Sequence, residues 1–444
     1  MKKLKLFNLA WPIFIETALF MLLGFIDVFV LSKYDDLAAS SVNTANQAVS
    51  IVTIVFTVIS GASAVLISQY LGAENKKGAS RIAALSITFN LIFGIIISAV
   101  LLLFNKQILT FIGAEGKILD FSCQYLSIVG GFIFLQAYLN SLSVIVRNHG
   151  MTQISMYVTV GMNIVNTVLD VIFVLGLFGL PKLGVIGVAV ATTFSRMVGA
   201  IILTIVIFTK VEKLSIFKLI KPFPVNDVKN MVKVGVPSAL ESFLYNLSQL
   251  VVTSIVLTCL SDVDLITKTY VQNITMFFYI FSVSIGQASQ ILTGHLVGAN
   301  KMDEAYKQGS KGYRNALIIT MIISVIGIIF RTQLINIFTH DAQVIELGSN
   351  ILIMNIILEL GRTTNLVVIA CLRGAGDVIF PTVCAIFSMW VISTLGSYIF
   401  AVTFGMGIYG LWIAFAADEC VRGIFMIWRW KSGKWRTKRL AAAE

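Results

Sequence analysis

Long apolar stretches separated by short polar connectors follow one another along all 444 residues of the chain. Each stretch holds about 20 or more residues, the length that a helix needs to cross the hydrocarbon core of a bilayer. The pattern predicts twelve membrane-spanning helices, at residues 7–33, 45–71, 82–104, 121–147, 155–180, 184–209, 231–260, 268–298, 313–338, 346–372, 379–404 and 406–430. Because the connectors are short, we expect neighbouring helices to pack antiparallel.

The low proportion of charged residues supports this fold class. Hydrophobic residues make up 57% of the chain and charged residues only 12%, whereas a soluble domain has about 25% charged residues. We therefore expect an all-α polytopic membrane protein. In a soluble protein the net charge of +11 would suggest a nucleic-acid partner. Here the basic residues lie in the connectors, where orientation in the membrane explains them, and we expect no nucleic-acid partner.

Lysine and arginine are distributed unequally between alternate connectors. Of the 33 such residues, 24 lie in the two ends and one set of connectors, and only 6 lie in the other set. Cytoplasmic connectors carry the excess of positive charge, so both termini are predicted to be cytoplasmic, which requires an even number of spans.

The basic start, MKKLKLF, resembles a signal peptide, but Glu16 interrupts the apolar run and no small-residue cleavage site follows. We expect the first helix to be retained.

The two halves of the chain repeat one another. Four matches follow in the same order at nearly the same offset: WPIFIE (11–16) with VPSALE (236–241), YLGA (70–73) with LVGA (296–299), VRNHG (146–150) with LRGAG (372–376), and GVIGVAVA (184–191) with GIYGLWIA (407–414). The first match pairs Pro12 with Pro237, and it also pairs Glu16 with Glu241. Since each half holds an even number of helices, we expect two six-helix bundles related by a pseudo-two-fold axis along the membrane normal.

These patterns predict the domain organisation. We expect an N-terminal six-helix bundle at 1–209, a cytoplasmic linker at 210–230, a C-terminal six-helix bundle at 231–430 and a cytoplasmic tail at 431–444. The linker is rich in lysine and includes an amphipathic SIFKLIK patch, which is expected at the cytoplasmic interface. The final LAAAE is expected to be an addition to the natural sequence.

Two carboxylates interrupt the first apolar stretch. An ionised carboxylate within a bilayer costs roughly 2.5–3.5 kcal/mol by insertion scales. Glu16 and Asp27 are eleven residues apart, so they share one helix face at a separation of about 16 Å. We predict that this face lines a water-filled cavity that a cation can enter. The alternative is that a neighbouring helix satisfies each carboxylate.

Pro12 leaves a helix carbonyl unpaired and is expected to act as a hinge.

A second polar stripe lies in the fifth span. Within GMNIVNTVLDVIF, Asn163, Asn166 and Asp170 fall on one helix face. Amide and carboxylate oxygens suit hard cations. Counting inward from the cytoplasmic ends places Asp27 and Asp170 in the outer half of the membrane, where the two residues could face one another in the first bundle. A helix-packing network around Asp170 is the alternative.

Other charged residues in the spans have neighbours of opposite charge. Glu359 and Arg362 stand three positions apart and are expected to form a structural pair. The adjacent residues Asp418 and Glu419 likewise reach Arg422, and these groups are expected to be structural. Arg196 has no partner three or four positions away, and no role is assigned to it.

Several of these segments together resemble the multidrug and toxic compound extrusion (MATE) family, particularly its DinF-like branch. They are LAWP with Asp27 fifteen residues after its proline, SQYLGA (68–73), the NxxxD of Asn166 and Asp170, and GVAVAT, which ends at Thr192. The resemblance covers nearly the whole chain. It implies a V-shaped pair of six-helix bundles in the bacterial inner (plasma) membrane, and cation-driven export of organic cations.

The resemblance also implies site residues. Asp27, Asn166, Asp170 and Thr192 would form the cation site of the first bundle, with Na⁺ on Asp27, Asn166 and Asp170 if sodium is the coupling ion. Glu241 matches the helix-7 glutamate of the sodium site in NorM-like members. Those members have an aspartate in helix 10, where this chain has Arg362. Because a fixed positive charge would repel sodium, the first bundle is favoured.

The expected function is therefore secondary antiport. We expect export of amphipathic organic cations in exchange for H⁺ or Na⁺, with no other cofactor, by a monomer whose partners are small organic cations and the lipid bilayer. We expect no enzyme, because neither a nucleophile–base pair nor a CxxC metal motif is present. The alternative is a lipid-linked saccharide flippase of the same superfamily. Such a flippase would need a cationic cavity, whereas the candidate cavity residues of the first half are mostly acidic.

Overall fold

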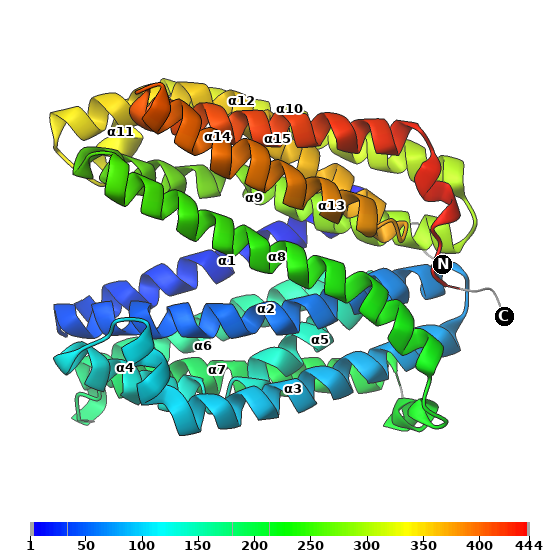
Figure 1. Cartoon of the computed structure of the whole chain (residues 1–444). Helices are drawn as coiled ribbons and strands as arrows, with labels where there is room; N and C mark the ends of the chain where they lie inside the picture. Colours follow the sequence, from blue (N-terminus) through cyan, green and yellow to red (C-terminus); the bar gives the residue numbers. More distant parts are fainter. Residues whose placement is uncertain (1–3, 33, 180, 213, 442–444) are drawn as a thin grey trace. The chain divides into compact units, whose positions relative to one another are not determined.

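The computed structural model describes residues 4–32, 34–179, 181–212 and 214–441, and these residues are mostly helical (Figure 1). Four lysines counted in the orientation argument, Lys2, Lys3, Lys33 and Lys213, lie outside the described residues, as do the last three residues of LAAAE.

Each of the twelve predicted spans coincides with a helical segment of the described structure. The first six are α1 (Leu6–Ser32), α2 (Asp36–Gly72), α3 (Lys76–Phe111), the pair α4 (Gly116–Val129) and α5 (Phe134–Asn148), α6 (Thr152–Leu175), and α7 (Val185–Val206) with the π-helical turn η2 (Ile207–Val211). The second six are α8 (Val225–Cys259), α9 (Asp262–Gly298), α10 (Met302–Ile329) with α11 (Arg331–Asn336), α12 (Ala342–Gly374), the segment from α13 (Ile379–Ser388) through η4 (Met389–Thr394) and α14 (Leu395–Tyr398) to η5 (Ile399–Thr403), and α15 (Gly407–Lys431). Short 3₁₀ helices are η1 (Leu177–Gly179), η3 (Leu214–Ile220) and η6 (Lys434–Thr437).

Most of these segments are apolar enough to cross a membrane. Ten of the described helical segments meet this condition singly, and α4 with α5 forms an eleventh span that is bent by 49°. The twelfth, α15, has 25 residues but carries Asp418, Glu419 and Arg422 in its middle. The all-helical fold of twelve predicted spans is thus confirmed.

The structure differs from the prediction at the helix ends and in the fourth span. α2 begins at Asp36 and α10 at Met302, well before the predicted spans at 45 and 313, because polar residues extend the helices beyond the apolar stretch. The fourth span is broken at Gly130 and Gly131. A Cβ atom on Gly130 would lie 2.4 Å from the carbonyl oxygen of Leu126, so the bend has no room for a side chain at this position.

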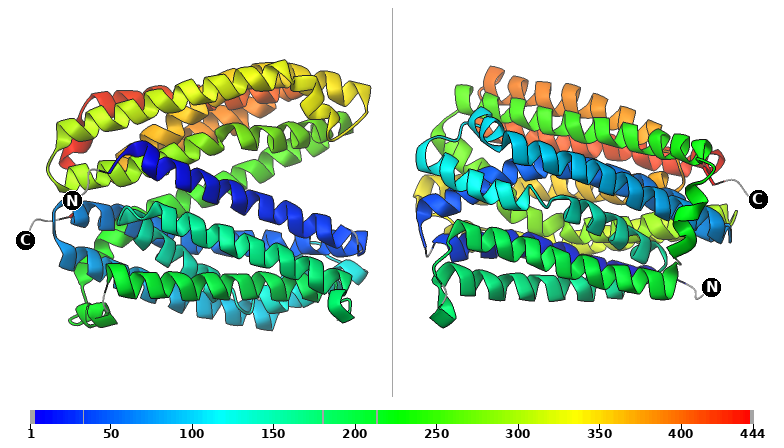
Figure 2. Two further views of the ribbon diagram at one scale, coloured as in Figure 1. Left: turned by 180° about the vertical axis from the view of Figure 1, so that it is seen from behind. Right: turned by 90° about the horizontal axis from the view of Figure 1, so that it is seen from below.

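Contacts divide the chain into two compact units. The N unit comprises 11–71 and 75–235, and the C unit comprises 236–444 together with 1–10 and 72–74. Figures 1 and 2 show from three directions that the long helices within each unit run side by side. Residues 215–220 of the SIFKLIK patch lie in η3, and the patch belongs to the N unit.

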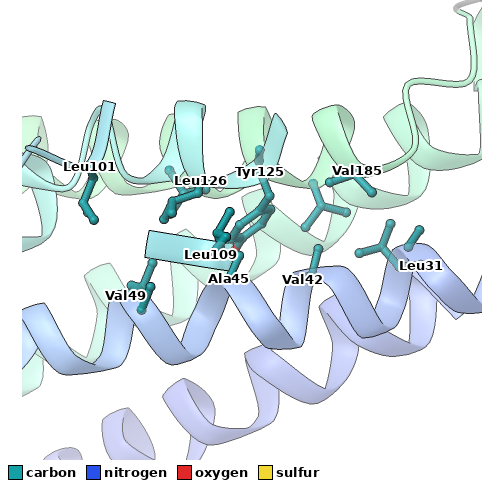
Figure 3. Packing of buried hydrophobic residues seen from close by; sticks show 14 of the residues in the cluster. Leu31, Val42, Ala45, Val49, Leu101, Leu109, Tyr125, Leu126 and Val185 are labelled. Atoms are coloured by element: carbon teal, nitrogen blue, oxygen red, sulfur yellow. The ribbon is translucent and has the colours of Figure 1, made fainter. Parts of the chain in front are cut away.

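Each unit has its own apolar core. In the N unit, residues of α2, α3, α4 and α7 interlock around Tyr125, as Figure 3 shows for Val42, Leu109, Leu126 and Val185. In the C unit the corresponding cluster brings α8, α9, α12 and α15 together. Close packing of these apolar side chains holds the helices in register, because van der Waals contacts between side chains stabilise helix pairs within a bilayer. This register positions the polar residues between the helices.

Candidate functional site

Asp27, Asn166, Asp170 and Thr192 come together inside the N unit. They project from α1, α6 and α7, and all four are buried, with Asp27 5% and Asp170 0% exposed. The carboxyl groups of Asp27 and Asp170 are within hydrogen-bonding reach of each other. The one-turn spacing of Asn166 and Asp170 on α6 explains how the amide also reaches the pair.

The Asn166 amide can face the carboxyl groups in either of two ways. With its nitrogen toward them, Nδ2 lies 3.1 Å from Asp27 Oδ1 and 3.1 Å from Asp170 Oδ2, while its oxygen accepts from the backbone N–H of Thr192 at 3.2 Å. In the reverse orientation Nδ2 lies 3.4 Å from Thr192 Oγ1, and the amide oxygen faces the two carboxyl groups. With its nitrogen toward the carboxyl groups, the amide donates hydrogen bonds to them, which suits a site without a metal ion. With its oxygen toward them, the amide and the two carboxyl groups together present only oxygen atoms, the ligands that a hard cation prefers.

Two residues that the sequence did not assign complete the surroundings of the carboxyl pair. Tyr125 on α4 is buried, donates to Asn46 Oδ1 at 3.3 Å and interacts electrostatically with Asp27. Arg196, one turn after Thr192 on α7, interacts electrostatically with Asp27 and Tyr125. The sequence places Arg196 within a span, but it does not predict the interaction with Asp27, because Asp27 lies on another helix. Two carboxylates and one guanidinium give this group one excess negative charge when all are ionised.

Asn163 lies one turn before Asn166 on α6 and is half-buried. Its amide nitrogen is buried and has no hydrogen-bond partner among the described residues.

Glu16 belongs to a different group of contacts. Its Oε1 accepts from Arg147 Nη2 at 2.6 Å and from Ser155 Oγ at 3.1 Å. About 16 Å of helix separates it from Asp27. Neighbouring helices thus supply donors to Oε1, as in the alternative prediction for Glu16, while Oε2 is buried and has no hydrogen-bond partner among the described residues. α1 runs through Pro12 without interruption.

Glu241 has the same kind of surroundings in the C unit. Its Oε2 accepts from Arg373 Nη2 at 2.7 Å and from Thr382 Oγ1 at 3.0 Å. We call Glu16–Arg147–Ser155 and Glu241–Arg373–Thr382 the repeat triads. Their glutamates and arginines occupy matching positions of the two halves, whereas Thr382 lies one residue beyond the position that matches Ser155. The sequence matches contain both glutamates and both arginines but do not show that they touch. Arg373 and Thr382 thus both contact the same carboxylate oxygen of Glu241.

The charged residues of α12 and α15 form one group in the C unit. Arg362 Nη1 lies 2.6 Å from Glu359 Oε1, and Arg362 Nε lies 3.8 Å from Glu419 Oε1. Arg422 Nη2 lies 2.8 Å from Glu419 Oε2 and 3.4 Å from Asp418 Oδ2. The two sets that the sequence treats separately are thus joined through Glu419.

The chain is similar to known proteins over nearly its whole length. A family model described as MatE matches residues 12–172 and 237–399. An uncharacterized transporter of Bacillus subtilis, YisQ, is 38% identical over 440 residues, which cover 99% of this chain and 96% of the relative. A probable multidrug resistance protein NorM of Thermotoga maritima is 29% identical over 448 residues, covering 99% and 94%. The crystal structure of a MATE protein in the bent conformation has a TM-score of 0.88 at 20% identity and covers 96% of this chain and 94% of that chain.

Proposed function

The chain belongs to the MatE family of membrane transporters, and we propose that it is a secondary antiporter that exports amphipathic organic cations in exchange for protons or sodium ions. Members of this family are transporters, so the protein is a multi-pass membrane transporter and not an enzyme. Relatives named as probable multidrug resistance proteins support small organic molecules as substrates. We further propose that the protein acts as a monomer in the bacterial plasma membrane with both termini cytoplasmic, as the distribution of lysine and arginine predicts.

The observation that carries the proposal is the buried pair of Asp27 and Asp170. An uncompensated charge in a membrane interior is costly, and this group has one excess negative charge after Arg196 is counted. Binding one monovalent cation removes the excess. Because the coupling ion and an organic cation both carry positive charge, each weakens the attraction of the N unit for the other. Such competition leads to exchange and not to transport of both in one direction.

Asn166 and Arg196 bear on the identity of the coupling ion. Sodium would need Asn166 Oδ1 as a third oxygen ligand beside the carboxylates, and it would experience repulsion from Arg196. A proton needs only one carboxyl oxygen, and the Asn166 amide then donates to the oxygens that remain. Replacing Asn166 by alanine should therefore abolish sodium-driven exchange but leave a proton-driven exchange measurable.

The direct test uses everted membrane vesicles and a fluorescent organic cation such as ethidium. Imposed gradients of pH and of sodium are compared in turn. We expect uptake in the wild type with at least one gradient, no uptake in Asp27→Asn or Asp170→Asn, and normal uptake in Asp120→Asn, a matched control at an exposed aspartate of α4. If neither gradient drives uptake of any organic cation by the wild type, the proposal is wrong.

A further inference from the structure

A second group of buried charges lies in the C unit, where α12 packs against α15. We call it the C-unit cluster, and it consists of Glu359, Arg362, Asp418, Glu419 and Arg422. The two helices approach closely at Gly361, where a Cβ atom would lie 2.7 Å from the carbonyl carbon of Glu419. This close packing brings the charged side chains of both helices within bonding distance.

Two of the three acids in the cluster, Asp418 and Glu419, each accept hydrogen bonds from more than one donor. Glu419 accepts from Arg422 at 2.8 Å and from Asn365 Nδ2 at 2.7 Å. Asp418 accepts from Arg422 Nη2 and from the hydroxyl group of Ser388. These contacts stabilise both carboxyl groups in the ionised form, because every donor favours the negative charge.

Glu359 differs from its two neighbours. Its side chain is 0% exposed, and its donors all converge on one oxygen. Oε1 accepts from Arg362 Nη1 at 2.6 Å and from Asn355 Nδ2 at 3.3 Å, while Trp412 Nε1 donates to Asn355 Oδ1 at 3.2 Å and so fixes that amide. Oε2 is buried and has no hydrogen-bond partner among the described residues.

The charges of the cluster do not balance. Three carboxylates face two guanidinium groups, which leaves one excess negative charge when all five are ionised. The groups that face it from α8 and α9 are Tyr245 and Tyr279, with the Arg362 guanidinium 4.9 Å from the Tyr279 ring centroid. Neither tyrosine supplies a positive charge. Glu241, which interacts electrostatically with Arg422, is paired with Arg373, so this pair does not compensate the excess either.

We propose that Glu359 Oε2 binds one proton, and that the C unit thereby has a coupling-ion site of its own, separate from Asp27 and Asp170. The inference rests on the proposed antiport. The proton forms an O–H bond at Oε2 when it enters and leaves as a hydrated proton on the other side. The contacts of Oε1 with Arg362 and Asn355 need not break, because the carbonyl oxygen of a protonated carboxyl group still accepts.

The site is built for a proton and not for a metal ion. The Arg362 guanidinium lies 2.6 Å from one oxygen of Glu359 and would repel a sodium ion at the other oxygen. A proton, in contrast, requires only the single unpartnered oxygen.

One consequence concerns the number of coupling cations that enter in each transport cycle. With one excess negative charge in each unit, a full cycle carries two coupling cations, one for the N unit and one for the C unit. Export of a monovalent organic cation then moves one net positive charge inward, and a membrane potential drives it. Without a site at Glu359 the exchange would be one for one and electrically silent.

The experiment uses purified full-length protein and two readouts. Infrared difference spectra recorded across a pH titration detect the carbonyl band of a buried, protonated carboxyl group. We expect a titrating band that is lost in Glu359→Gln and kept in Glu419→Gln, the matched control on the facing helix. Any carbonyl band that disappears in Asp170→Asn is assigned to the carboxyl pair of the N unit. If Glu359→Gln does not fold, Glu359→Asp should shift the band instead of removing it.

The second readout is the reversal potential of ethidium transport in proteoliposomes. We expect about two charges entering per ethidium ion exported by the wild type and about one in Glu359→Gln. An unchanged infrared band or an unchanged stoichiometry in Glu359→Gln overturns the inference while leaving the antiport intact. Failure of the wild type to couple ethidium to any ion gradient overturns the proposed function, and the infrared titration then still decides whether Glu359 binds a proton.

Discussion

Replacing Arg362 by alanine is expected to destabilise the protein far more than replacing Glu241 by glutamine. Arg362→Ala removes the guanidinium that lies 2.6 Å from Glu359, which is fully buried, and its weaker contact with Glu419 at 3.8 Å. Breaking a buried pair by removing one partner costs about 3–5 kcal/mol. In Glu241→Gln the amide oxygen still accepts from Arg373 and Thr382, so the loss should be about 1 kcal/mol.

Thermal unfolding of the detergent-solubilised variants measures this difference. For a domain of 150–250 residues, a loss of 3 kcal/mol corresponds to a fall in melting temperature of about 6–12 °C, against about 3 °C for Glu241→Gln. The fall for Arg362→Ala should be smaller at low pH than at high pH, because a proton on Glu359 removes the charge that has lost its partner.

The double variant Glu359→Gln/Arg362→Ala provides the internal control. It should recover part of the stability lost in Arg362→Ala, since no uncompensated carboxylate remains, and coupling energies of 0.5–3 kcal/mol are typical for residues in contact. Small and equal falls in melting temperature for Arg362→Ala and Glu241→Gln, with no recovery in the double variant, would show that Arg362 is hydrated and unimportant for stability.

Three further predictions concern the N unit. Asp27→Asn and Asp170→Asn should reach the membrane at normal levels yet give no drug resistance in a sensitive host, and wild-type resistance from either would remove that residue from the mechanism. Pro12→Ala should bind substrate normally but turn over more slowly, as measured by the separate effects on KM and Vmax; an unchanged Vmax would reduce the proline to a packing role. Arg196→Gln should raise the apparent affinity for the coupling ion several-fold, because the positive charge that repels the ion is gone. The measurement is the ion dependence of transport, and a lower or unchanged affinity would contradict the charge count.

The sequence predicts the architecture well because hydropathy and internal repetition report on long segments. Every predicted span has a helix, including α15, where the charges of Asp418, Glu419 and Arg422 weaken the apolar signal. The ends of α2 and α10 are less predictable, since their polar extensions are helical without being apolar. The bend between α4 and α5 depends on the close approach of backbone to Gly130, which a single sequence does not reveal.

Pairing between helices is the part of the site that the sequence does not reveal. Spacing along one helix predicts that Glu359 and Arg362 are neighbours, and the structure places them in contact. No such spacing connects Glu16 to Arg147, which are 131 positions apart, or Arg196 to Asp27. These contacts follow from the register of packed helices, which the summed burial of many apolar side chains determines.

The repeat triads bear on the ancestry of the chain. Both halves still carry the glutamate and the arginine at matching positions, whereas the buried charges of the N-unit carboxyl pair have no such counterparts. At the offsets of the surrounding matches, the counterpart of Asp27 is Val252 and that of Arg196 is Glu419. The simplest history is a six-helix ancestor that already had this glutamate and arginine before its gene was duplicated. The duplicated halves then acquired different buried charges, and the proposed difference in ion binding between them would be one that two identical halves could not have had.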